Sequence, residues 1–447
     1  MHRLLSVILL AGTCLAQDDV ARMEQVVQSY VSAKQFMGSA LVARNGAVVL
    51  SKGYGSANLE WDIPNTPTTK FRLGSVTKQF TAASILLLEE RGKLSVNDPV
   101  RKYIPDAPAA WDKVTIYHLL THTSGIPSFT GFPEYGPTEA LPTTPEKLVA
   151  RFRDKPLEFQ PGEKWNYSNS GYVLLGYLIE KITGESYAKF VRENIFEPLA
   201  MKDSGYDSNS AILPHRASGY TPSPTGPQNA GFVHMSIPHA AGALYSTTED
   251  LLRWELGLFG GKLLKPESLV KMTTPFKDDY AFGLSVHGEG KHKVIEHGGG
   301  IEGFNTQLSY YPESKLAVIV LGNLNGGAPG EIATKLATVA FGEKVVLPNE
   351  RKEVAVASKI LAQYAGTYEI SPTFQIVISV EGDHLMTQAT GQSKFPLFAE
   401  SDSKFFLKVV DATVDFVKND KGEVTHLMLH QGGQDVKAVR KPETVAK

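Results

Sequence analysis

A serine and a lysine three residues apart are the first residues in this chain whose types and spacing could do chemistry. Ser75 and Lys78 open an apolar helical pattern that runs to Arg91, so both side chains share one face of its first turn. Backbone N–H groups at a helix start point outward without partners, which suits acyl transfer at the serine. Burial and the positive end of the helix both disfavour a protonated lysine. Lys78 is therefore a candidate base for a Ser75 nucleophile.

The Ser-x-x-Lys pattern is not specific by itself. The chain holds three further copies, Ser186/Lys189, Ser268/Lys271 and Ser401/Lys404. Any one of them is explained equally well by chance or by a serine that caps a helix. The copy at Ser75 differs in the glycine before it, Gly74, and in the uncharged apolar helix after it.

A tyrosine and an asparagine form the second group. Tyr167-Ser168-Asn169 follows a predicted turn and precedes a helical pattern from Tyr172 to Ile182. A phenol can pass a proton between a nucleophile and a leaving group, and a neighbouring amide can hold both a lysine and a substrate. The plainer alternative is a loop tyrosine beside a capping asparagine.

The third group is His297-Gly298-Gly299-Gly300, followed by a strand-like run that ends at Tyr310. Glycines beside a strand let a substrate carbonyl approach the backbone, so the N–H of Gly300 could complete an oxyanion hole with that of Ser75. Three glycines here also match a dinucleotide fingerprint, but that motif needs a helix after it, where this sequence predicts a strand.

Other catalytic and binding chemistries find little support. His118 and His122 have the spacing of a metal pair, but no glutamate follows the first histidine and no third ligand is apparent, so we expect them to be structural. No Gly-x-Ser-x-Gly elbow and no phosphate-binding glycine loop is present. A net charge of −2 also argues against a nucleic-acid or anionic-membrane partner.

The first 16 residues have the order of a secretory signal peptide. A basic start is followed by an apolar run from Leu4 to Leu10 and small residues down to Ala16, which predicts cleavage after Ala16 and a periplasmic or secreted protein. The run is too short for a transmembrane helix, and no later segment comes close. Cys14 is the only cysteine, so a mature chain without it has no disulfide or thiolate chemistry.

The remaining chain of 447 residues suggests two domains. Residues 17–345 mix strand-like and helical patterns and predict an α+β domain, in which two Pro/Gly-rich loops, about 125–145 and 219–240, are typical of the walls of a functional site. A charged linker over 346–357 follows. Residues 358–447 alternate in the manner of strands, with turns at Gly382 and Gly422, and predict a small antiparallel β domain.

The three groups in this order resemble the class C β-lactamase and penicillin-binding superfamily of serine hydrolases. Further segments are similar to that family, including Thr115–Gly125, Tyr167–Tyr172 and Val318–Asn323. The resemblance implies an antiparallel sheet flanked by helices with an all-helical subdomain, and a site between them. It also implies an acyl-enzyme on Ser75 released by water, with no metal and no organic cofactor. Residues 358–447 resemble the lipocalin-like domain often appended to such hydrolases.

Within this resemblance, we predict that Ser75, Lys78 and Tyr167 are catalytic. Asn169 and His297 would position the substrate and tune Tyr167, while Gly299 and Gly300 would form the oxyanion side of the site. β-Lactamases of this class usually carry Lys-Thr-Gly where this chain has His297-Gly298-Gly299. The missing threonine hydroxyl removes a usual partner of a substrate carboxylate, so β-lactam turnover ranks below hydrolysis of peptides or esters.

The expected substrate is a small peptide or ester with a D-amino acid or acyl group, which includes peptidoglycan-derived peptides. Esterase and D-peptidase activity remain alternatives of nearly equal weight. A rival from another class is a catalytically silent protein of the same fold that binds peptidoglycan or peptides. A third reading makes the C-terminal β domain the functional part.

Overall fold

The computed structural model describes residues 18–223, 225–431 and 434–442. The predicted signal peptide, residues 1–16, lies outside the described residues. Contacts divide the chain into two compact units, one of residues 36–337 and one that combines residues up to 35 with those from 338 onward. Among the described residues, no helix combines the length and the apolar character needed to cross a membrane.

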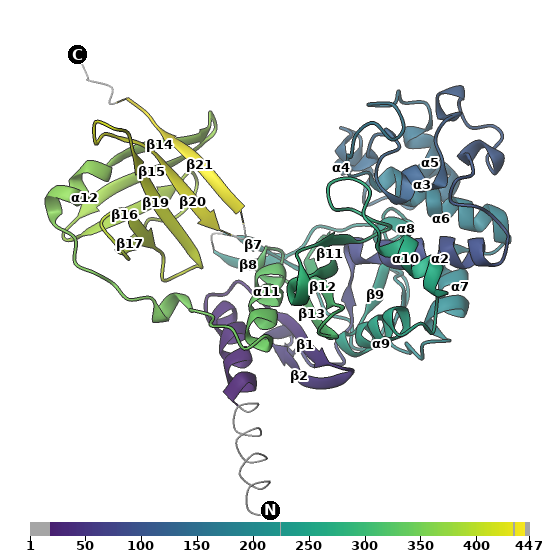
Figure 1. Cartoon of the computed structure of the whole chain (residues 1–447), viewed down its shortest axis with the longest axis horizontal. Helices are drawn as coiled ribbons and strands as arrows, with labels where there is room; N and C mark the ends of the chain where they lie inside the picture. The colour runs from purple at the N-terminus through teal and green to yellow at the C-terminus, as the bar shows by residue number, and fades with distance from the viewer. Residues whose placement is uncertain (1–17, 224, 432–433, 443–447) are drawn as a thin grey trace, which may run out of the picture. The chain divides into compact units, whose positions relative to one another are not determined.

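An antiparallel sheet of six strands forms the centre of the larger unit. Its order is β10-β11-β12-β13-β1-β2, with β1 (Gly38–Arg44), β2 (Ala47–Tyr54), β10 (Ser285–His287), β11 (Val294–Ile301), β12 (Phe304–Tyr311) and β13 (Leu316–Gly322). Every residue of β13 is buried, as expected for an interior strand that is covered on both faces. The helix α9 (Thr248–Phe259) packs on β13 and β1 (Figure 1).

A helical region lies at one side of this sheet (Figure 1). Its centre is α2 (Thr77–Glu90), which is buried at its first twelve positions and packs against α6, α7 and α8. The region also contains α3 (Ile116–Leu120), α4 (Tyr135–Thr138), α5 (Pro145–Arg153), α6 (Asn169–Thr183), α7 (Tyr187–Val191), α8 (His239–Gly242) and α10 (Pro266–Thr273). Helix α11 (Ala328–Ala340) lies on the opposite side of the sheet (Figure 1). The predicted α+β class is confirmed.

Three small sheets of short strands lie outside the main sheet within the described ranges. A three-stranded sheet has the order β5 (Phe71–Arg72), β9 (Leu244–Ser246) and β6 (Gly205–Tyr206), and two hairpins pair β3 (Ser56–Asn58) with β4 (Ile63–Pro64) and β7 (Tyr220–Ser223) with β8 (Gly226–Asn229). Strand β5 leads directly into the segment that carries Ser75.

Local sequence signals explain several element boundaries. Strands β1 and β2 form a β-hairpin, because Asn45 and Gly46 both take positive φ and make its two-residue turn. The helix predicted from Ser75 begins with a 3₁₀ turn, η1 (Gly74–Val76), before α2. Helix α6 is capped by the Ser168 side chain and ends at Gly184 in the left-handed conformation.

The predicted C-terminal β domain is a closed barrel of eight antiparallel strands. They are β14 (Gly366–Ser371), β15 (Phe374–Glu381), β16 (His384–Ala389), β17 (Phe395–Ala399), β18 (Lys404–Phe406), β19 (Ala412–Lys418), β20 (Val424–Gln431) and β21 (Gln434–Arg440). Helix α12 (Ser358–Tyr364) precedes them, and its Tyr364 stacks on Phe416 at 4.2 Å between ring centroids. The barrel thus has an apolar core of its own.

Candidate active site

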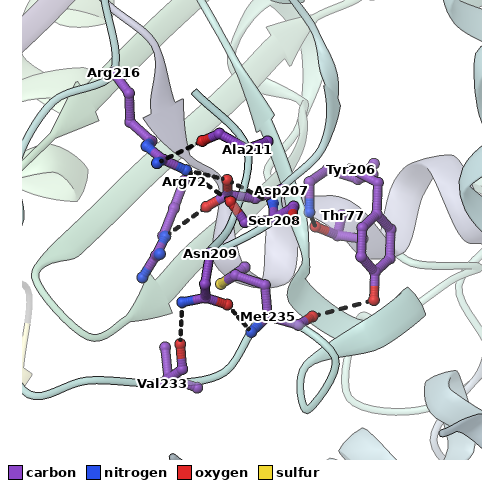
Figure 2. Close-up of polar contacts among 11 residues, drawn as sticks. Arg72, Thr77, Tyr206, Asp207, Ser208, Asn209, Ala211, Arg216, Val233 and Met235 are labelled. Carbon is purple, nitrogen blue, oxygen red and sulfur yellow. Dashed lines mark hydrogen bonds and ion pairs between the residues drawn. The ribbon is translucent and has the colours of Figure 1, made fainter. Parts of the chain in front are cut away.

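A cleft opens beside Ser75, between the edge of the sheet and the helical region. The two loops predicted as walls both contribute to it, since its lining consists of Gly74, Ser75, Phe129, Thr130, Tyr135, Asn169, Val233, Ile237, Pro238, Ala241, Gly242, Gly300, Ile301 and Glu302. Asn209 fixes one wall. It donates to the carbonyl of Val233 at 3.0 Å and accepts from the N–H of Met235 at 2.7 Å (Figure 2).

Ser75 and Lys78 meet at the start of α2. Gly74, with φ +54°, turns the chain from β5 into η1, and Lys78 follows in the first turn of the helix. The Nζ of Lys78 lies 2.9 Å from the Oγ of Ser75. Ser75 is half-buried against the cleft, whereas Lys78 is fully buried.

The Lys78 amine has two further partners, and both can only accept a hydrogen bond. The Oδ1 of Asn169 and the backbone carbonyl oxygen of Ala241 each lie 2.9 Å from Nζ. Burial holds the pKa of Lys78 well below its ordinary value, which favours the neutral amine as the form that acts on Ser75. A neutral amine has two N–H groups and one lone pair. Asn169 and Ala241 take both N–H groups, which leaves the lone pair facing the Ser75 hydroxyl.

Asn169 is held in this orientation by the loop that lines the cleft. Its Nδ2 donates to Thr130 Oγ1 at 3.1 Å, and its backbone N–H donates to Ser128 Oγ at 3.1 Å. The Lys78 N–H group, which can only donate, fixes the Oδ1 end of the amide toward Lys78, and the Thr130 hydroxyl accepts from the opposite end. The amide is thus pre-oriented on two sides.

Tyr167 stands just before the cap of α6, next to both groups. Its ring centroid lies 4.7 Å from the Nζ of Lys78. Burial raises the pKa of its phenol well above the ordinary value, although a hydrogen bond with Ser75 acts in the opposite direction. The phenol is therefore protonated at neutral pH and placed to exchange a proton with the serine oxygen.

Two glycine contacts bring β11 against the segment that carries Ser75. A Cβ on Gly74 would lie 2.8 Å from the backbone N of Gly300, and a Cβ on Gly299 would lie 1.9 Å from the carbonyl oxygen of Leu73. Only glycine permits both approaches. The backbone of Gly300 thus borders the cleft beside Ser75, on the side where an oxyanion would form.

His297 is buried below the cleft and belongs to a chain of hydrogen bonds. The Tyr280 hydroxyl lies 2.9 Å from His297 Nε2 and 3.2 Å from His122 Nε2. The other nitrogen of His297 lies 2.5 Å from the carbonyl oxygen of Gly298. The Nδ1 of His122 faces the backbone N–H of Ser168, at 3.1 Å.

The backbone groups at the two ends of this hydrogen-bond chain determine which nitrogen of each histidine carries the proton. The Ser168 N–H can only donate, so His122 carries its proton on Nε2 and donates to Tyr280. The Gly298 carbonyl can only accept, so His297 carries its proton on Nδ1 and accepts from the Tyr280 hydroxyl at Nε2. Burial lowers the pKa of His297 to about 4 and that of His122 well below its ordinary value. Both rings are therefore neutral near neutral pH.

The structure brings together all the residues predicted for the site, and it adds several that sequence reasoning missed: Ser128, Thr130, Ala241 and Tyr280. His118 and His122 do not form a metal pair, because His118 caps its own helix through Thr115 while His122 bonds Tyr280. Within the described residues no group of three His, Cys, Asp or Glu side chains is placed to hold a metal ion.

A family model described as Beta-lactamase matches residues 23–341. The chain belongs to this family, the β-lactamase and penicillin-binding protein superfamily of serine hydrolases. Residues 350–441, which include the barrel, match a model described as a domain of unknown function, DUF3471.

Individual relatives agree with this assignment. Penicillin-binding protein 4* of Bacillus subtilis (strain 168) is 28% identical over 453 residues, which cover 95% of this chain and 100% of the relative. The putative penicillin-binding protein PbpX of the same organism is 32% identical over 314 residues, 70% of this chain and 77% of the relative.

Solved structures give the same result. The octameric penicillin-binding protein homologue from Pyrococcus abyssi is 29% identical with a TM-score of 0.66, and the match covers 94% of this chain and 100% of that one. A D-stereospecific amidohydrolase from Streptomyces sp. is 26% identical with a TM-score of 0.61, over 72% of this chain and 99% of that one.

Proposed function

We propose that the protein hydrolyses small amides, peptides or esters with a D-amino acid or acyl group, through an acyl-enzyme on Ser75. The observation that carries this proposal is the buried Lys78 amine, whose Nζ lies 2.9 Å from the Ser75 hydroxyl oxygen and 2.9 Å from two further oxygens that accept its N–H groups. A buried neutral amine at 2.9 Å is a competent general base for serine.

The proposed reaction has two halves. In the first, Ser75 Oγ attacks the substrate carbonyl carbon while Lys78 accepts its proton, and the N–H groups of Ser75 and Gly300 hold the oxyanion. Tyr167 relays a proton to the leaving amine or alcohol, the bond to that group breaks, and the acyl group stays on Ser75. In the second half, water attacks the ester with the same groups in reverse and releases the acid.

The choice of substrate follows from two features. Gly298 offers no hydroxyl to a substrate carboxylate, which disfavours β-lactams. The D-stereospecific amidohydrolase of similar structure supports amides of D-amino acids as the first substrates to try. Export, predicted from residues 1–16, fits a substrate derived from peptidoglycan and is part of this proposal.

The test compares the wild-type protein with Ser75→Ala. Both are incubated with a fluorophosphonate probe and with p-nitrophenyl acetate, and the adduct is located by peptide mass spectrometry. We expect an adduct on Ser75 and a loss of turnover of at least about a thousandfold in the variant. Ser401→Ala, at an exposed copy of the same Ser-x-x-Lys pattern, is the matched control and should behave as wild type. Equal turnover in all three proteins would instead favour a catalytically silent binding protein.

A further inference from the structure

A carboxylate with one unpaired oxygen lies in the wall of the cleft. Glu302 stands at the tight turn between β11 and β12, next to Gly303 with φ +81°, and it lines the same cleft as Ser75 and Asn169. Its Oε2 atom is buried and, within the described part of the chain, has no hydrogen-bond partner. A buried carboxylate oxygen without a partner is costly, so a group that occupies the cleft and donates to it would be favoured.

The basic side chain whose charge acts on Glu302 already has another partner. The charge of Arg72 acts on Glu302, but its Nε donates to Asp207 Oδ2 at 2.8 Å (Figure 2). Asp207 is buried, and its other oxygen accepts from Arg216 at 2.7 Å. The two arginines thus hold Asp207 from both sides, and no ion pair joins either of them to Glu302 among the residues that the structure describes.

A second acidic residue strengthens the negative character of this wall. Glu139 acts on Glu302 with the same sign, and both carboxylates act on the phenol of Tyr135, which also lines the cleft. Burial and the Glu139 charge raise the pKa of Glu302, while a hydrogen bond from its own backbone N–H and the charge of Arg72 oppose that change. A cation bound in the cleft would offset the desolvation cost of the Glu302 carboxylate and its repulsion from Glu139.

We propose that Glu302 binds a protonated amino group of the substrate. The preferred acyl donors are then amino acid amides, esters or peptides whose amino group is free, rather than N-acylated ones. This inference rests on the proposed acyl transfer at Ser75 for its catalytic consequence, but the binding of the ammonium group does not require Ser75 to react.

The kinetic test uses substrates that differ only in the amino group. D-Alanine p-nitroanilide, its N-acetyl derivative and N-acetyl-D-lysine p-nitroanilide are compared on wild type and Glu302→Gln. We expect kcat/KM for the free-amine substrate to fall about 10- to 100-fold in the variant, with the N-acetyl-alanine substrate and p-nitrophenyl acetate changed less than about twofold. A loss on the lysine substrate instead would assign Glu302 to a side-chain ammonium rather than the α-amino group.

Controls separate this inference from the proposed function. Glu289→Gln removes an exposed carboxylate from the same unit and should leave all substrates unchanged. An equal loss on free and N-acetylated substrates in Glu302→Gln, or no loss on either, would overturn the role of Glu302.

A binding measurement covers the case in which the protein hydrolyses none of these substrates. In the Ser75→Ala background, calorimetry should show that D-alaninamide binds more tightly than N-acetyl-D-alaninamide, and that Glu302→Gln abolishes this preference. Equal affinities for the two amides would contradict ammonium binding, whereas a preserved preference without turnover in the wild type would contradict only the proposed hydrolysis.

Discussion

The hydroxyl of Tyr280 donates its proton to Nε2 of His297, while its oxygen accepts a hydrogen bond from Nε2 of His122. His297 therefore presents a fixed tautomer with its proton on Nδ1. Its ring lies 6.3 Å from that of Tyr167 between centroids, so the hydrogen-bond chain ends beside the proposed proton relay. Such supporting bonds typically determine how well a catalytic group is held.

The first prediction concerns this chain of hydrogen bonds. Tyr280→Phe removes the shared hydroxyl and leaves two buried histidine nitrogens without partners. We expect kcat/KM for p-nitrophenyl acetate to fall about 10- to 100-fold and stability to fall by about 1–3 kcal/mol. Tyr187→Phe, which removes a buried hydroxyl bonded to Thr81, is the matched control. If the two variants lose activity equally, the hydrogen-bond chain through Tyr280 has no special role in positioning the catalytic groups.

The second prediction concerns the buried lysine. Burial places the folded-state pKa of Lys78 well below 10.5, so between these values the unfolded chain binds more protons and this term makes stability rise with pH. In Lys78→Met the term is absent. The melting temperature of wild type minus that of the variant should therefore increase from about pH 6 to pH 9. A difference that is constant with pH would show that Lys78 is charged in the folded protein.

The third prediction concerns the stability of the protein at acid pH. The folded-state pKa of His297 is about 4, below the ordinary 6.5, so the stability it contributes is full above pH 6.5 and is lost as pH falls toward 4. The loss from this residue amounts to roughly 3 kcal/mol. Denaturant unfolding should show a smaller acid loss in His297→Gln, whereas His287→Gln, at a histidine whose pKa is raised by Glu296, should show a loss at least as large as that of wild type.

The fourth prediction concerns the contact between β11 and η1. In Gly299→Ala, the new Cβ would meet the backbone of Leu73, and backbone atoms can yield only by moving the strand. We expect a loss of about 1–3 kcal/mol in stability and of about a hundredfold in kcat. Gly136→Ala, where the added Cβ meets nothing within 4 Å, should change neither. Wild-type activity in the first variant would mean that the strand position is not critical.

The groups that share a local sequence signal could be predicted. Ser75 and Lys78 lie within one helical turn, and Tyr167 and Asn169 lie at one helix start, so their proximity follows from spacing. The barrel could be predicted as a β domain from alternation and turns, but its closure depends on the pairing of β14 with β21. That pairing joins segments about seventy residues apart, and no local pattern records it.

The missed residues act through long-range contacts or through the backbone. Ala241 contributes a carbonyl oxygen, which every residue has, so its type gives no signal. Tyr280 reaches His122 from 158 positions away, and Thr130 fixes Asn169 from a loop whose sequence indicates only a wall. Glu302 is conspicuous only because its oxygen is buried without a partner, which is a property of packing.

The lysine amine is held by groups from three segments of chain, 91 positions away at Asn169 and 163 positions away at Ala241. Its state therefore reports whether those segments are docked. If gentle heating or denaturant loosens the packing of α6 or α8 on α2, water reaches the amine, the amine takes up a proton, and the nucleophile loses its base while the helices are still formed. Loss of activity should thus precede loss of helical signal, so an enzyme assay gives the earliest sign of unfolding.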